Sequence, residues 1–367
     1  MTMTINGTSG LVFNDASTQN TAASGFGFKN RLINGAMMID QRNAGALVNP
    51  MADSTYYLDR WRASSSQTSK LSIGQDAGGV TPPAGFTDYM GFTSLSSYSI
   101  TSTDIFGIAQ NIEGFNVADL GWGTANAQPV TLSFWVRSSL TGTFGGSFRN
   151  SASSRSYPIS YTISAANTWE YKTVTVAGDT TGTWLTTNGI GILLFLSLGS
   201  GSSYSGTAGS WSSSTFTSST GATSVVGTSG ATFYITGVQL EKGSTATSFD
   251  YRPYGTELSL CYRYFQKFLG SSVYEALPSY AIAGTTAAEG FLAYKGTMRS
   301  TPTLASSTLC LLDAVGLFPI SGTVATNNGL DSMRITYSGI SGLTQYRSYY
   351  VTANNSTSAF LTLSAEL

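Results

Sequence analysis

FYITGVQLEKGSTATSFDYRPYGTELSLCYRYFQK, residues Phe233–Lys267, closes one folded unit and opens the next. The pattern of Thr232–Leu240, TFYITGVQL, predicts the last strand of a β-sheet. A turn region containing Pro253 follows, after which Thr256 is placed to cap a short helix. The apolar positions of that helix follow a spacing of three or four residues and are Leu258, Cys261, Phe265 and Phe268. We therefore predict a short bridging helix or strand over residues 255–269.

The composition of the 367-residue chain indicates an all-β protein. Gly and aromatic residues are abundant, with 41 Gly and 12% Phe, Trp and Tyr, as in turn-rich proteins built from short strands. Charged residues make up only 10%, and the formal net charge is −1. Such a chain offers no positive surface to a polyanion, so we expect no nucleic-acid binding. Because the length exceeds that of one typical domain, we expect two globular units with small extensions.

Residues 30–254 carry the strand patterns of a jelly-roll-like β-sandwich. In Val130–Arg137 apolar side chains alternate with Thr131, Ser133, Trp135 and Arg137, which predicts a half-buried strand. Trp169–Val176 predicts another strand, and the apolar run Ile190–Leu198 suits a strand covered on both faces. The Ser/Gly/Thr-rich insert of residues 199–230 has the composition of a flexible loop. Its three aromatic residues favour the alternative that it folds against the sandwich or a neighbouring subunit.

Residues 270–367 return to strand patterns and predict a second, smaller β-sandwich. The predicted strands of this unit are Phe291–Met298, Ser332–Tyr337, Tyr346–Thr352 and Phe360–Leu363. The two cysteines, Cys261 and Cys310, are far apart and have no metal-ligand spacing, so we expect two buried free thiols.

Residues 30–42, NRLINGAMMIDQR, and the later Leu58-Asp59-Arg60-Trp61 pair with Phe233–Lys267 as two ends of one unit. These motifs resemble those that open and close the carbohydrate-binding-module-like β-sandwich of tailed-bacteriophage tail-fibre and receptor-binding proteins. The resemblance implies a virion adhesin that binds a host surface polysaccharide. It also implies a homotrimer, with other tail or baseplate proteins as partners. Several copies per particle would then strengthen individually weak binding.

Residues 1–29 contain the short apolar segment Gly10–Phe13, followed by NDASTQ. This resembles the F-x-D-G-S-x-Q segments at the head of phage fibre proteins, with Ala16 where Gly is usual. We predict a strand for attachment or trimerisation, with Leu11, Val12 and Phe13 as its apolar contacts. A frayed terminus is the alternative.

Most catalytic chemistry is excluded because the chain has no histidine. A Ser-His-Asp triad, a Cys-His pair and a His-ligated zinc site all require one. Glycoside hydrolysis needs only two carboxylates, and the acidic candidates are Asp59, Glu113, Asp119, Glu170 and Glu241. Nothing in the sequence pairs them, and the short-period repeats of a β-helical depolymerase are missing. We therefore predict a protein that is not an enzyme.

Sugar sites combine an aromatic platform with groups that hydrogen-bond hydroxyls. The candidate platform residues are Trp122, Trp135, Trp184, Tyr204 and Trp211. Trp122, flanked by glycines, and Trp211, in the polar insert, are expected to be the most exposed. Trp61 is expected in the core.

No cofactor and no metal are predicted. Related sandwiches often bind calcium between their first and last strands, and Asn34, Asp40 and Glu241 lie in the matching segments. Their spacing forms no calcium loop, and a hydrogen-bonding role is the simpler interpretation.

The segment MTMTINGTSG has no signal-peptide pattern, and the longest apolar run is too short to cross a bilayer. We expect synthesis in a bacterial cytoplasm, no membrane insertion, and assembly into a virion as part of its tail fibre. The alternative is a head-fibre, decoration or tail-assembly protein that contacts only other virion proteins, and a polysaccharide depolymerase is disfavoured.

Overall fold

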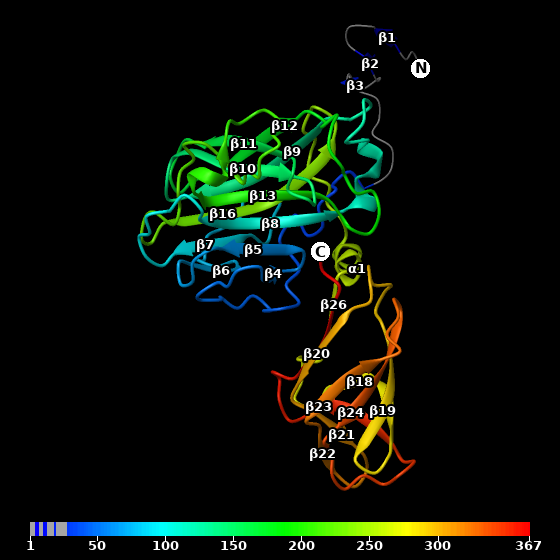
Figure 1. Cartoon of the computed structure of the whole chain (residues 1–367). Coiled ribbons are helices and arrows are strands. Elements are labelled where there is room, and N and C mark those ends of the chain that lie inside the picture. The colour runs from blue at the N-terminus through cyan, green and yellow to red at the C-terminus, as the bar shows by residue number, and fades with distance from the viewer. Residues whose placement is uncertain (1–3, 7–9, 13–17, 20–27) are drawn as a thin grey trace.

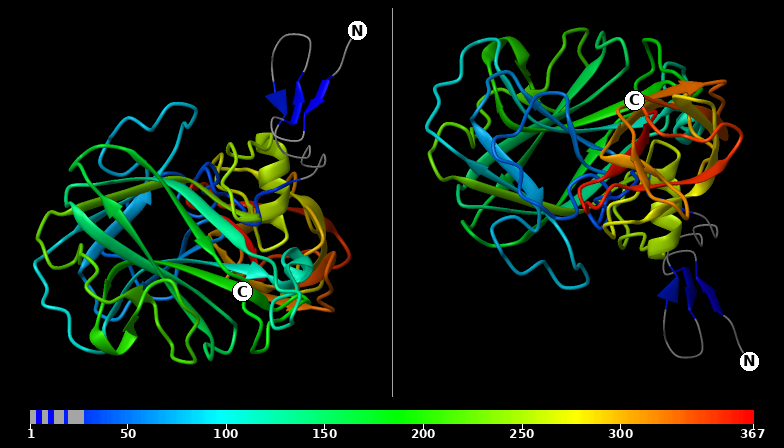
Figure 2. Two further views of the ribbon diagram at one scale, coloured as in Figure 1. Left: turned by 90° about the horizontal axis from the view of Figure 1, so that it is seen from above. Right: turned by 90° about the horizontal axis from the view of Figure 1, so that it is seen from below.

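The computed structural model describes residues 4–6, 10–12, 18–19 and 28–367, and these residues are nearly all β-structure. A large jelly-roll-like sandwich is followed by one α-helix and a smaller C-terminal sandwich (Figure 1). Seen from above and from below, α1 and the C-terminal sandwich lie toward one edge of the large sandwich (Figure 2). The predicted fold class is confirmed.

Two antiparallel sheets form the first sandwich, with the orders β11-β10-β13-β8-β5-β4 and β12-β9-β16-β7-β6. The six-stranded sheet consists of β4 (Tyr56–Leu58), β5 (Trp61–Ser65), β8 (Ile105–Glu113), β10 (Gly142–Arg149), β11 (Ser156–Ile163) and β13 (Ile190–Ser200). The five-stranded sheet consists of β6 (Leu71–Gln75), β7 (Met90–Ser94), β9 (Val130–Ser138), β12 (Glu170–Val176) and β16 (Thr232–Lys242). Short 3-10 turns, η1 (Gly114–Asn116) and η2 (Ala118–Leu120), follow β8.

The core of the first sandwich follows from the alternation in its strands. The inward residues of β9, Val130, Leu132, Phe134 and Val136, are fully buried, whereas Trp135 and Arg137 are partly exposed. Strand β13 is buried on both faces, as its continuous apolar run predicts. Trp61 is fully buried, which confirms its predicted place in the core.

The Ser/Gly/Thr-rich insert folds against the sandwich, so the prediction of a flexible loop is wrong and its alternative is confirmed. It contains η3 (Ser202–Tyr204) and the parallel pair β14 (Ser205–Gly206) and β15 (Ser218–Ser219). Val225 and Val226 are fully buried in the main core. Backbone hydrogen bonds in both directions between Ser156 and Ser212 tie the insert to β11. Composition does not indicate this packing, because a segment of small polar residues can pair its backbone N–H and C=O groups with the sandwich without burying much apolar area.

The two motif-bearing ends of the first sandwich pack on one another. Asn30 Nδ2 donates to the carbonyl of Val238 at 3.0 Å, and its Oδ1 accepts the N–H of Leu240 at 3.0 Å. A Cβ atom on Gly35 would lie 2.1 Å from the carbonyl oxygen of Val238, so only glycine fits there. The opening segment, residues 30–42, thus packs against the last strand, β16, and holds it through these hydrogen bonds.

Helix α1 (Tyr254–Tyr262) follows Pro253, so the predicted cap at Thr256 is wrong. Pro253 has the extended conformation of a helix N-cap, and its carbonyl accepts the N–H groups of Thr256 and Glu257. The helix leads into β17 (Phe265–Phe268), which pairs with β26 (Phe360–Ser364) near the other end of the described chain.

The C-terminal sandwich packs a three-stranded sheet, β17-β26-β20, against a seven-stranded sheet, β22-β21-β25-β18-β19-β24-β23. Its further strands are β18 (Ala276–Ala283), β19 (Ala287–Ala293), β20 (Thr303–Ser307), β21 (Leu309–Leu312), β22 (Leu317–Pro319), β23 (Gly322–Thr326), β24 (Ser332–Ser338) and β25 (Ser348–Ala353). The predicted strand Phe291–Met298 is misplaced, because β19 ends at Ala293 and a turn follows. Cys261 and Cys310 are buried free thiols, as predicted.

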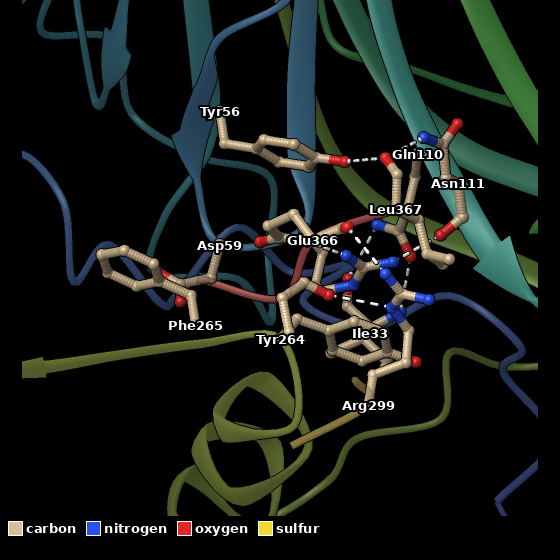
Figure 3. Close-up of polar contacts among 12 residues, drawn as sticks. Ile33, Tyr56, Asp59, Gln110, Asn111, Tyr264, Phe265, Arg299, Glu366 and Leu367 are labelled. Carbon is tan, nitrogen blue, oxygen red and sulfur yellow. Dashed lines mark hydrogen bonds and ion pairs between the residues drawn. The ribbon is translucent and has the colours of Figure 1, made fainter. Parts of the chain in front are cut away.

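The chain near residue 367 returns to the first sandwich and locks the two sandwiches together (Figure 3). The Glu366 carboxylate pairs with Arg60 and with Arg42, the latter at 2.8 Å. The hydroxyl of Tyr56 and the side-chain amide of Asn111 both donate to the carbonyl oxygen of Leu367, each at 2.6 Å. This polar junction is buried, so it fixes one sandwich against the other.

Three short strands near the N-terminus, β1 (Thr4–Asn6), β2 (Gly10–Val12) and β3 (Thr18–Gln19), form their own antiparallel sheet. Leu11 and Val12 lie in β2, while Phe13 lies outside the described residues. The attachment and trimerisation role of Leu11, Val12 and Phe13 stays a prediction.

Candidate functional site

An aromatic groove of about 590 Å³ lies on the outer face of the five-stranded sheet. Its strand residues are Trp135 and Ser133 from β9 and Tyr171 from β12. Trp135 and Tyr171 are direct cross-strand partners, with ring centroids 5.4 Å apart and ring planes tilted by 50°. Tyr171 is 44% exposed. The two rings therefore present a solvent-facing aromatic surface on a rigid sheet.

Two loops form the wall of this aromatic groove. Phe86 comes from the loop before β7, and Phe249 and Tyr251 come from the loop between β16 and α1. The three rings contact one another pairwise at centroid distances of 4.9–5.5 Å. Tyr251 also donates its hydroxyl to the carbonyl of Gly85 at 2.8 Å, which ties the loops together.

The loops can approach because β16 contains a bulge at the groove. The pairing register of β16 with β9 shifts between Thr236 and Gln239. Gly237 lies in this bulge with φ +61°, and a Cβ there would meet the Phe86 ring at 2.5 Å. Bulges often redirect the chain beside binding sites. Here the bulge gives Phe86 its place over the sheet.

Hydroxyl groups complete the lining at Ser133, Thr247 and Ser248. The buried carboxylate of Glu241 fixes this side of the groove. It accepts one hydrogen bond from the Thr247 N–H at 2.8 Å and another from the Thr247 hydroxyl at 2.7 Å. The site therefore offers flat apolar rings beside polar hydroxyl groups. This combination suits a ligand with one C–H-rich face and many hydroxyls.

Three of the predicted sugar-site residues pack together elsewhere. Trp122, Trp184 and Trp211 form an edge-to-face cluster with centroid distances of 4.7–5.4 Å. Each indole N–H donates to a backbone carbonyl, at 2.7–3.1 Å. The expectation that Trp122 is exposed is wrong, since only 6% of it is accessible. Trp211 is only partly accessible because it packs against this cluster and the core.

Tyr204 lies in η3 of the insert and is partly exposed, away from the aromatic groove. Trp135 is thus the one predicted platform residue that lines the groove. Phe86, Tyr171, Phe249 and Tyr251 also line the groove and are not among the residues predicted from the sequence. Tyr171 could have been found, because the outward face of the predicted strand Trp169–Val176 includes it. The loop residues gave no such signal, because only the bulge at Gly237 brings them to the sheet.

The five acidic candidates for glycoside hydrolysis are each engaged with a neighbouring side chain. Glu241 accepts a hydrogen bond from the Thr247 hydroxyl. The other four form ion pairs, which are Asp59–Arg42, Glu113–Arg263, Asp119–Arg31 and Glu170–Lys172. Hydrogen bonds from Arg263 and Tyr264 outweigh burial and lower the pKa of Glu113. Burial raises the pKa of Asp59 to about 6, against the opposing effect of Arg42.

Asn34, Asp40 and Glu241 are each engaged in separate hydrogen bonds. Asn34 Oδ1 accepts the Ile39 N–H, and the two Asp40 carboxylate oxygens accept N–H groups of Asn43 and Gly45, at 2.8–2.9 Å. These residues do not present a set of uncommitted oxygen ligands, and they do not fit a calcium site. Within the described ranges, no group of three or more His, Cys, Asp or Glu side chains is placed to hold a metal ion.

Comparison with known proteins shows no family for this chain. No family model matches the chain, and no curated protein matches it. A putative sugar-binding protein from Bacteroides thetaiotaomicron is similar over 58% of this chain and 100% of its own, at 11% identity and a TM-score of 0.34. TmCBM61, solved with β-1,4-galactotriose, is similar over 58% and 99%, at 10% identity and a TM-score of 0.31.

The enzymatically active domain of bacteriophage CBA120 tailspike protein 4 is similar over 53% of this chain, at 12% identity and a TM-score of 0.30. The match spans only 21% of that tailspike domain. At such TM-scores these likenesses carry no argument. In the part of the chain that the structure describes, no helix has the length and apolarity to cross a membrane.

Proposed function

We propose that this chain binds glycans without cleaving them, through the aromatic groove of the first sandwich. The observation that carries the proposal is the pair of the partly exposed Trp135 and the exposed Tyr171 at the base of a groove with aromatic walls. An aromatic ring stacks against the C–H face of a pyranose, and hydroxyl groups such as that of the exposed Ser248 hydrogen-bond its edges.

We further propose a virion adhesin, a homotrimeric tail-fibre or receptor-binding protein that attaches to host surface polysaccharide. The paired motifs at residues 30–42 and 233–267 support this role. The contacts between Asn30, Val238 and Leu240 give those motifs a shared architectural purpose. Immunolabelling of virions for electron microscopy tests the location, and labelling of heads alone would contradict a tail fibre. A monomeric mass by light scattering at micromolar concentration would contradict the trimer.

The binding test uses a glycan array printed with bacterial surface oligosaccharides. Wild-type protein is expected to bind a discrete set of glycans, and Trp135→Ala to lose at least tenfold in affinity, as expected for a central aromatic contact. Phe115→Ala is the matched control, because Phe115 is an exposed aromatic residue (58%) of the same sandwich that lies outside the groove. Equal binding by wild type and Trp135→Ala refutes this site. Release of new reducing ends from a bound polysaccharide refutes the non-enzymatic assignment.

A further inference from the structure

The outer face of the seven-stranded sheet in the C-terminal sandwich is unusually apolar for a solvent-facing surface. Strands β18 and β19 alternate strictly between buried and exposed residues, so one face packs into the core. The opposite face presents Tyr280, Ile282 and Phe291, each about 60% exposed. Contiguous exposed apolar patches on soluble proteins commonly mark binding sites.

This face is hollowed into a second groove of about 1140 Å³, here called the C-terminal groove. Tyr280 and Ile282 of β18, Phe291 of β19 and Tyr346 before β25 supply its large apolar surfaces. Arg334 and Glu289 lie among them. The volume exceeds the range of about 300–1,000 Å³ typical of small-molecule pockets, which favours an extended ligand.

An aromatic pair in this sheet repeats the arrangement found in the first sandwich. Tyr280 and Tyr350 are direct cross-strand partners of β18 and β25, with centroids 4.9 Å apart and ring planes tilted by 45°. Trp135 and Tyr171 show the same pairing in the aromatic groove. Tyr280 lines the C-terminal groove, and Tyr350 adjoins it on the next strand. Both sandwiches therefore carry an exposed pair of rings on a rigid sheet.

Polar groups at the C-terminal groove match the hydroxyls of a sugar. Glu289 and Arg334 form an exposed ion pair through Oε2 and Nη1, at 3.3 Å. Arg334 Nε also donates to Thr326 Oγ1 at 3.1 Å. Among the described residues these contacts leave Glu289 Oε1 as an acceptor beside Arg334 Nη2 as a donor. One hydroxyl of a vicinal diol can donate to the carboxylate while the other accepts from the guanidinium, so the pair complements a diol.

Shape argues against a two-fold dimer in which this face meets the same face of a second copy. A two-fold interface brings the same patch of both subunits together, so the patch must be self-complementary. Two hollows facing one another would enclose a void, which forfeits contacts. A polysaccharide chain, in contrast, can fill a hollow with its rings stacked on the aromatic residues.

We propose that the C-terminal groove is a second glycan-binding site, separate from the aromatic groove of the first sandwich. It takes an oligosaccharide segment, with a pyranose face on Tyr280 and Phe291 and a diol on Glu289 and Arg334. The proposal takes its ligand class from the proposed function, but it rests on different residues. Each chain then has two sites for one polysaccharide.

The test compares three variants on the same glycan array and against its best-bound polysaccharide in affinity electrophoresis. Tyr280→Ala/Phe291→Ala removes the rings of the C-terminal groove, Trp135→Ala removes the platform of the aromatic groove, and the third variant combines them. Tyr274→Ala is the control, since Tyr274 is exposed (47%) in the C-terminal sandwich and lies outside the groove. Circular dichroism checks that every variant is folded.

Tyr280→Ala/Phe291→Ala is expected to reduce retention by the polysaccharide at least tenfold, and the combined variant to abolish it. Unchanged binding by Tyr280→Ala/Phe291→Ala, with loss in Trp135→Ala, overturns the second site and leaves the proposed function standing. Loss only in Tyr280→Ala/Phe291→Ala supports the second site and refutes the first. If this double variant instead converts an oligomer to a monomer in sedimentation velocity and keeps full glycan binding, the face is an interface between copies and the proposal is wrong.

Discussion

Removing the charge of Glu366 is expected to destabilise the junction between the two sandwiches. Its side chain is 7% exposed and forms ion pairs with Arg60, which is 2% exposed, and with Arg42. The Arg60 guanidinium lies over the Tyr264 ring at 3.6 Å, and that of Arg42 lies over the Phe265 ring at 3.7 Å. Both arginines are therefore held in place by the first sandwich and the residues that follow α1.

Glu366→Gln leaves Arg60 buried without a carboxylate. Breaking a buried ion pair costs about 3–5 kcal/mol. Asp59 lies 3.6 Å from Arg42 and compensates part of the loss, so we expect the lower end of that range. The free energy of unfolding of the first sandwich should fall by about 3 kcal/mol. The assay can isolate this sandwich, because all six tryptophans, at positions 61, 122, 135, 169, 184 and 211, precede residue 254.

Guanidinium chloride unfolding followed by tryptophan fluorescence measures this difference. The control is Glu289→Gln in the C-terminal sandwich. Glu289 and its ion-pair partner Arg334 are both about half exposed, at 52% and 45%. Exposed pairs contribute about 0–1 kcal/mol, so this control should unfold at nearly the wild-type midpoint. If Glu366→Gln behaves like the control, the buried pair does not stabilise the junction and the reasoning fails.

Three more perturbations test other parts of the structure. Burial holds the pKa of Asp59 near 6, above its ordinary value of 3.8, so its ionisation should lower the stability of the fold as the pH rises from about 4 to about 6. This pKa difference corresponds to at most about 3 kcal/mol of the free energy of unfolding. Asp59→Asn should remove this pH-dependent loss of stability. If the melting temperatures of wild type and Asp59→Asn change in parallel with pH, the prediction is wrong. Trp211→Ala should reduce the free energy of unfolding by about 3 kcal/mol, because it opens the tryptophan cluster, whereas lost glycan binding at unchanged stability would make Trp211 a ligand residue. Gly237→Ala should lower the free energy of unfolding by about 1–3 kcal/mol, because its φ of +61° is strained for alanine. Glycan binding should also weaken, because the added Cβ displaces Phe86. Full glycan binding by this variant would show that Phe86 is not needed in the wall of the groove.

Strand periodicity predicted the sheets because burial in a sandwich repeats every second residue. The alternation around Trp135 placed this residue outside and Phe134 inside, and the structure agrees. Periodicity failed for Trp122 and Trp211, because their surroundings in sequence are polar or glycine-rich. Their burial depends on contacts with one another and with Trp184, and those contacts exist only after the loops fold.

The candidate site was harder to predict than the fold, since loops distant in sequence build its wall. Phe86 and Tyr251 meet with ring centroids 5.5 Å apart although 165 positions separate their numbers, 86 and 251. Neither lies in a strand whose periodicity would indicate its direction. The stretch Phe233–Lys267 closes the first sandwich and opens the next unit, and its residues Phe249 and Tyr251 also line the groove.

The junction determines what two binding sites on one chain can achieve. Linking two sites raises the apparent affinity only if both can engage one ligand at once, and a flexible linker dilutes the second site. Here the chain crosses between the sandwiches twice, through α1 into β17 and again after β26, where Glu366 and Leu367 contact the first sandwich. Two chain crossings at one interface oppose both hinge bending and rotation. The two grooves therefore hold a fixed relative orientation, and a glycan whose shape matches that orientation binds both without a further loss of linker entropy.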